Sequence, residues 1–132
     1  MRLYLDSSAI VKLVQREPES DALARFLDDH RDDEHVTSTI ARVEVVRPLQ
    51  PSGAEAVARV RQLLAHMYHV PLDADLLDRA AALAPDSLLR SLDAVHLASA
   101  QLLGAELRGV VTYDRSMASA AAGLRLPVAA PV

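Results

Sequence analysis

Short apolar runs alternate with stretches that carry apolar residues at helical spacing, and this alternation most restricts the fold of the 132-residue chain. The clearest runs, residues 2–5 and 109–113, are each followed at once by an aspartate, Asp6 and Asp114. Strand-like and helix-like segments in alternation are typical of a parallel sheet covered by helices on both faces. We therefore expect an α/β fold, a three-layer α/β/α sandwich with a mostly parallel central sheet, in one domain over residues 1–132.

The remaining segments follow the same pattern. Apolar periodicity predicts helices over 9–14, 20–30, 39–46, 54–66, 73–85, 92–103 and 116–122, and further strands over 35–38, 68–72 and 126–129. The helix at 39–46 is expected to end before Pro48, because proline lacks the backbone N–H that continues a helix. Pro127 favours an edge position for the last strand.

Charge and composition exclude several classes of function. A net charge of -4 gives no overall positive field for polyanions, so any nucleic-acid contact must use a local patch. The absence of cysteine removes disulfides, thiolate metal sites and cysteine nucleophiles, and it fits a reducing compartment. No apolar stretch approaches the roughly 20 residues that a membrane span needs. We expect a cytoplasmic protein that makes no membrane contact.

Four acidic residues lie at predicted strand ends or on predicted helix faces that carry apolar residues, where an ionised side chain is unusual. Asp6 and Asp114 follow strands, at the edge of a parallel sheet where ligands bind, although helix capping alone also explains an aspartate there. A rotation of 100° per residue places Glu44 on one face with Ile40 and Val43, where the alternative is a simple ion pair with Arg47.

The fourth acid, Asp93, opens a helix that is apolar almost all round, where the alternative role is stabilisation of the first helical turn. Clustered carboxylates would repel one another, and the only lysine of the chain is Lys12. A divalent cation resolves the repulsion, and carboxylates suit Mg²⁺ or Mn²⁺ better than Zn²⁺. His96 could join such a site, but a lone histidine on a buried helix is more often a hydrogen-bonded packing residue.

Several of these segments together carry a family resemblance. They are residues 4–13 (YLDSSAIVKL), Ser38 with 41–44 (ARVE), 90–100 (RSLDAVHLASA) and 111–114 (VTYD). In this order and spacing they resemble the PIN-domain ribonucleases, specifically the VapC-type toxins. The resemblance implies a compact α/β/α sandwich, Mg²⁺- or Mn²⁺-dependent cleavage of RNA, a homodimer, and neutralisation by a cognate antitoxin. The first helix also favours a homodimer, because its apolar residues Ile10, Val11, Leu13 and Val14 are more than one buried face requires.

The acids match that family's acidic quartet position by position, which makes Asp6, Glu44, Asp93 and Asp114 the expected catalytic and metal-binding residues. Asp6 and Asp93 are the expected principal metal ligands, with the other two orienting water or a second ion. Ser7, Ser8 and Thr112 are expected to hold the carboxylates in place by hydrogen bonds, although capping alone would also account for these hydroxyls.

Other readings of the same pattern remain open. A phospho-acceptor signalling domain would need a lysine at a late strand end, where this chain has none. A haloacid-dehalogenase-like phosphatase would need a second acid two residues after Asp6, where Ser8 stands. A PIN-like fold that only binds a partner, without catalysis, is made less favourable by four acids in place.

Overall fold

A single five-stranded sheet forms the centre of the computed structural model, which describes residues 1–132. Its strands lie in the order β3-β2-β1-β4-β5, and every neighbouring pair is parallel. The strands are β1 (Arg2–Leu5), β2 (Glu34–Ser38), β3 (Tyr68–Val70), β4 (Leu107–Val111) and β5 (Val128–Ala129). The first strand is central, with Leu3 paired to His35 on one side and to Gly109 on the other.

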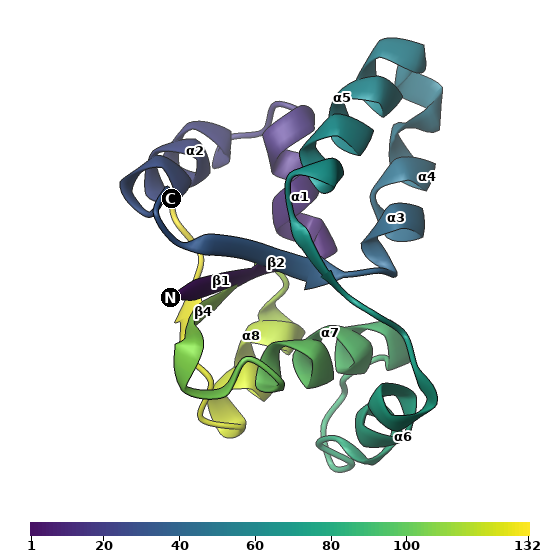
Figure 1. The fold of residues 1–132 in the computed structure, drawn as a ribbon, viewed down its shortest axis with the longest axis vertical. Helices are drawn as coiled ribbons and strands as arrows, with labels where there is room; N and C mark the ends of the chain where they lie inside the picture. Colours follow the sequence, from purple (N-terminus) through teal and green to yellow (C-terminus); the bar gives the residue numbers. More distant parts are fainter.

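Helices cover both faces of this sheet (Figure 1). One face carries α1 (Ser7–Val14), α2 (Ser20–Asp29), α3 (Ala41–Glu44), α4 (Val46–Leu49), the 3-10 turn η1 (Gln50–Ser52) and α5 (Ala54–Ala65). The other face carries α6 (Ala74–Ala82), α7 (Ser91–Gln101), the 3-10 turn η2 (Gly104–Glu106) and α8 (Arg115–Gly123). The expected three-layer α/β/α architecture with a parallel sheet is therefore confirmed.

The alternation of side chains along β1 divides the core between the two faces. Leu3 and Leu5 point into the cluster formed with α1, α2, α4 and α5, whereas Tyr4 points into the cluster formed with α7 and α8. All three side chains are at most 1 % exposed. Such a doubly covered strand needs apolar residues at every position, which explains why residues 3–5 read as one continuous apolar run.

Several elements are shorter than predicted, among them β3, which ends at Val70, and α6, which ends at Ala82. Two further differences have a clear physical reason. The helix at 39–46 does not end before Pro48: the chain breaks near Val45, and Pro48 lies within the new helix α4. A proline is tolerated in the first turn of a helix because the N–H groups there have no helical partner. Strand β4 ends at Val111 rather than at Tyr113, because the Tyr113 N–H donates to Ser8 Oγ instead of continuing the sheet ladder.

The faces of two helices also differ from expectation. Val43 is 53 % exposed, so it does not share an inward stripe with Glu44, and Ala41 and Val45 fill that role. The extra apolar residues of α1, Val11, Leu13 and Val14, pack against the core cluster of their own chain.

None of the helices combines the length and the apolar character needed to cross a membrane.

Candidate active site

The carboxyl ends of β1 and β4 meet at one edge of the sheet, and each delivers an aspartate there. Asp6 directly precedes α1 and accepts a hydrogen bond from the Ala9 N–H, while Asp114 precedes α8 and accepts one from the Met117 N–H. Both aspartates therefore cap helices, and capping accounts for only one carboxylate oxygen of each.

Glu44 and Asp93 reach the same place from other elements. Glu44 is the last residue of α3, and Asp93 lies in the first turn of α7 with only 8 % exposure. Together with Asp6 and Asp114 they line one small cavity of about 130 Å³. Four acids that are far apart in the sequence thus share one pocket, and its remaining lining residues are Ser7, Ser8, Arg90, His96 and Met117.

Asp6 is the most firmly held of the four. Its carboxylate accepts hydrogen bonds from Ser8 Oγ at 2.7 Å and the Ala9 N–H at 3.0 Å on one oxygen, and from the Thr112 hydroxyl on the other. Burial raises the pKa of Asp6 above its ordinary value, and the donors from Thr112, Ser8 and Ala9 oppose that rise. The structure thus gives a buried acid three donors that favour its charged form.

Thr112 links the two aspartates at the strand ends. While its hydroxyl donates to Asp6, the same oxygen accepts the backbone N–H of Asp114 at 3.1 Å. The side chain is fully buried. Both bonds act on the same hydroxyl, so the position of one aspartate is coupled to the backbone of the other.

Glu44 is bonded to a histidine and a serine rather than to Arg47. Its Oε1 lies 2.6 Å from His96 Nε2 and 2.8 Å from Ser7 Oγ. Burial alone would raise the pKa of Glu44, but the bonds from His96 and Ser7 outweigh it and hold the pKa below its ordinary value. An ionised carboxylate only accepts, so His96 Nε2 carries the proton of this bond.

His96 continues the network into the core. Its other ring nitrogen, Nδ1, is hydrogen-bonded to the Tyr4 hydroxyl, which lies 2.7 Å away. The imidazole is 1 % exposed. His96 is therefore the hydrogen-bonded packing residue that its position indicated, and it also orients one acid of the pocket.

Arg90 is the residue of the pocket that the sequence argument missed. Its Nε lies 3.2 Å from Asp93 Oδ2, and its second terminal nitrogen lies 3.3 Å from Asp114 Oδ2. Lys12 forms ion pairs with two glutamates ahead of α2 instead. The spacing of three residues between Arg90 and Asp93 signals the first contact, whereas the second spans 24 residues and needs the fold.

The donor set of the pocket fits a hard divalent cation. Four carboxylates face a single guanidinium, and oxygen ligands of this type suit Mg²⁺ or Mn²⁺. No three Asp, Glu or His side chains yet stand close enough together to enclose an ion. Arg90, which contacts both Asp93 and Asp114, supplies the positive charge between these two carboxylates.

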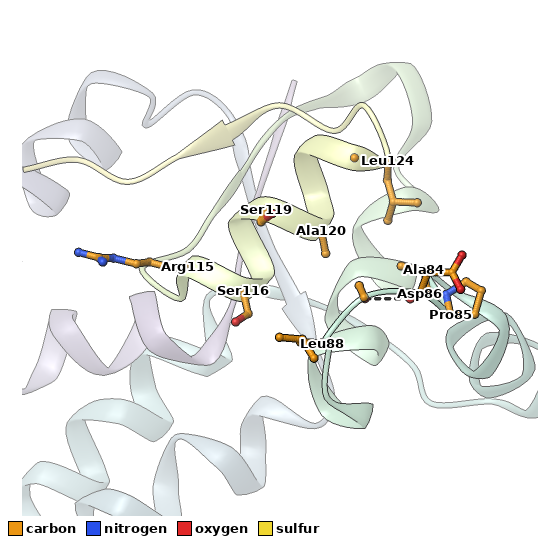
Figure 2. A pocket seen from close by; sticks show the side chains of 11 residues that line it. Ala84, Pro85, Asp86, Leu88, Arg115, Ser116, Ser119, Ala120 and Leu124 are labelled. Carbon is orange, nitrogen blue, oxygen red and sulfur yellow. Dashed lines mark hydrogen bonds between the residues drawn. The ribbon is translucent and has the colours of Figure 1, made fainter.

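A larger hollow of about 660 Å³ lies beside the acidic pocket, between α8 and the segment 84–88 (Figure 2). Arg115, Ser116 and Ser119 line it from α8, and Leu88, which is 93 % exposed, lines it from the opposite segment. Asp86 is its only acid. The convergence of carboxylates, rather than the volume of a cavity, therefore identifies the smaller pocket as the candidate site.

Comparison with known proteins agrees with this architecture. The family model described as PIN domain matches residues 3–123. Ribonuclease VapC46 of Mycobacterium tuberculosis is 49 % identical over 129 residues, which cover 98 % of this chain and 97 % of that protein. Ribonuclease VapC35 of the same species is 44 % identical over 131 residues, covering 98 % and 96 %.

Among solved structures, a toxin-antitoxin complex from Klebsiella pneumoniae aligns with a TM-score of 0.73 over 98 % of both chains, at 21 % identity, which speaks for the fold alone. The family match covers most of the chain, and the curated relatives match over nearly its whole length. The chain therefore belongs to the PIN domain family, in its group of VapC ribonucleases.

Proposed function

We propose that this protein is a metal-dependent endoribonuclease that hydrolyses phosphodiester bonds in RNA, as the toxin of a type II toxin-antitoxin pair. The observation that carries the proposal is the convergence of Asp6, Glu44, Asp93 and Asp114 from four elements on one pocket. Membership in a group of ribonucleases supports the reaction class.

The proposed roles follow from the contacts of each acid. Asp6 is fixed by three donors and Asp93 is nearly buried, which suits both as principal ligands of Mg²⁺ or Mn²⁺. Glu44, held by His96 and Ser7, and Asp114, capping α8, would orient water or a second ion. When bound, the cation would lower the pKa of water and neutralise charge on the scissile phosphate.

The hydroxyl groups have a supporting role in this proposal. Ser8 and Thr112 donate to Asp6, and Ser7 donates to Glu44. These bonds fix the direction of the carboxylates before any ligand arrives, so less order has to be imposed at the moment of reaction. No side-chain nucleophile is needed.

Two partners belong to the proposal. A cognate antitoxin is supported by membership in the VapC group of ribonucleases and by the resemblance to VapC-type toxins. A homodimer rests on the family resemblance, because the apolar residues of α1 that first suggested it pack within their own chain. RNA as substrate places the proposed action in the cytoplasm.

The test is RNA cleavage by the purified protein with Mg²⁺ or Mn²⁺ and with EDTA. Asp6→Asn and Asp93→Asn should each abolish cleavage while circular dichroism stays unchanged. Glu55→Gln, which removes an exposed acid of α5, is the matched control and should cleave as the wild type does. Cleavage in EDTA, or a fully active Asp93→Asn variant, would refute the proposed site. A protein that binds RNA without cleaving it would be a binding module instead.

A further inference from the structure

We propose that Arg90 is the exchangeable counter-ion of the metal-free pocket, and that its guanidinium must leave Asp93 and Asp114 before a divalent cation binds there. Arg90 thereby influences the metal affinity of the site without contacting the metal itself. This inference rests on the proposed function, because it concerns the same carboxylates.

The guanidinium spans the mouth of the pocket. It contacts one oxygen of each carboxylate, at 3.2 Å on Asp93 and 3.3 Å on Asp114, and so joins the start of α7 to the end of β4. Apart from the imidazole of His96, Arg90 is the only basic side chain that lines the pocket. Without it, the two carboxylates would have no positive charge between them.

The contacts of Arg90 are those of a group that can leave. Its side chain is 77 % exposed, whereas those of Asp93 and Asp114 are 11 % and 27 % exposed. Both bonds are longer than the roughly 2.7–2.9 Å of a strong charge-assisted hydrogen bond. Water and salt compete for the exposed guanidinium, which limits what these pairs contribute to stability.

The backbone also allows the exchange. Arg90 precedes α7 and has an extended conformation, with φ -78° and ψ 161°. Its side chain makes no bond to the helix other than the one to Asp93. The guanidinium can therefore swing into solvent while α7 and its carboxylate stay in place.

Competition follows from the shared oxygens. A cation held by Asp93 and Asp114 would compete with the positive charge of Arg90 for the same carboxylates. The apparent dissociation constant is the intrinsic one divided by the fraction of molecules in which Arg90 has left. Pairs whose guanidinium is exposed in this way should weaken metal binding about three- to fivefold.

The experiment measures Mn²⁺ binding by calorimetry on the full chain, for the wild type, Arg90→Gln, Arg90→Lys and Arg115→Gln. Arg115 lies next to Asp114, is exposed and forms no ion pair, so its variant removes the same charge without removing the bridge. Arg90→Gln should bind Mn²⁺ about three- to fivefold more tightly, and Arg90→Lys should lie between it and the wild type. Arg115→Gln should stay within about twofold of the wild type.

A second readout is the melting temperature. The Arg90→Gln variant lacks the counter-ion of the metal-free pocket. The difference in melting temperature between saturating Mn²⁺ and EDTA should therefore be larger for this variant than for the wild type. Unchanged or weaker Mn²⁺ binding by Arg90→Gln would overturn the inference. An equal gain in Arg115→Gln would do so too, because it would show a general charge effect.

These outcomes are distinguishable from a failure of the proposed function. If the wild type neither binds Mn²⁺ nor cleaves RNA, the proposed function and the inference fall together. If it binds Mn²⁺ and cleaves RNA while Arg90→Gln leaves the affinity unchanged, only the inference falls.

Discussion

The Nε2 atom of His96 lies 2.6 Å from Oε1 of Glu44, and this contact joins the buried helix α7 to the end of α3 across 52 residues of sequence. On its other side the same ring is hydrogen-bonded to the hydroxyl of Tyr4, in the centre of β1. A polar chain, buried at Tyr4 and His96 and partly exposed at Glu44, thus connects the sheet to the rim of the active site. Such chains are stable when every member is satisfied and costly when one is removed.

Tyr4→Phe should destabilise the protein, because it leaves His96 Nδ1 buried without a hydrogen-bond partner. We expect a loss of about 1–2 kcal/mol in the free energy of unfolding, measured by urea denaturation. Tyr113→Phe is the matched control: its hydroxyl donates to the Pro131 carbonyl at 2.8 Å in a partly exposed position, so its removal should cost less. Equal losses in the two variants would show that the Tyr4 hydroxyl contributes nothing specific to the core.

Thr112→Val should reduce RNA cleavage by about 10- to 100-fold with little change in fold, since it removes the hydroxyl that donates to Asp6. Burial already raises the pKa of Asp6, and loss of this donor raises it further. A carboxylate that binds metal must be ionised, so the acid limb of the pH–rate profile should shift to higher pH.

Thr112→Ser keeps the hydroxyl and is the control for the loss of the donor. It should retain most of the activity and the original acid limb. A Thr112→Val variant with unchanged activity and an unchanged pH profile would mean that the hydroxyl serves only to cap the turn ahead of α8.

The strand ends and their acids could be predicted because local pattern decides them. Asp6 and Asp114 follow continuous apolar runs, and parallel strands bring such residues to one edge. The contact of Arg90 with Asp114 could not be predicted, because it depends on how α7 meets β4. The prediction that the helix ends before Pro48 was wrong for a similar reason. Proline is excluded from the middle of a helix, but the break at Val45 places Pro48 in the first turn of a new helix, where proline is tolerated.

Asp33→Asn should lower the melting temperature by a few degrees at neutral pH and by less in acid. The Asp33 carboxylate is 8 % exposed and is paired with Arg108 of β4 and with the amino terminus, which together hold its pKa below the ordinary value. A carboxylate with a lowered pKa stabilises the fold above its unfolded pKa of about 3.9, and this contribution is lost as the pH falls through the folded pKa.

The control for this pair comes from the end of α2, a few residues earlier in the chain. Asp28 pairs with Arg31 at 3.7 Å, with both side chains more than 70 % exposed, so Asp28→Asn should leave the melting temperature unchanged at either pH. If Asp33→Asn lost as much stability in acid as at neutral pH, its effect would come from packing rather than from charge.

Mg²⁺ should raise the melting temperature of the wild type, because the pocket holds four carboxylates against one guanidinium. At ten times its dissociation constant an ion adds about 1.4 kcal/mol to the free energy of unfolding, or a few degrees in melting temperature for a domain of this size.

Asp93→Asn should show a smaller rise and should be no less stable than the wild type in EDTA, since it removes one of several repelling charges. Asp21→Asn, which alters an exposed pair with Arg16 on α2, should keep the full rise. A wild type whose melting point ignores tens of millimolar Mg²⁺, together with an Asp93→Asn variant that is destabilised in EDTA, would make Asp93 a structural residue held by Arg90.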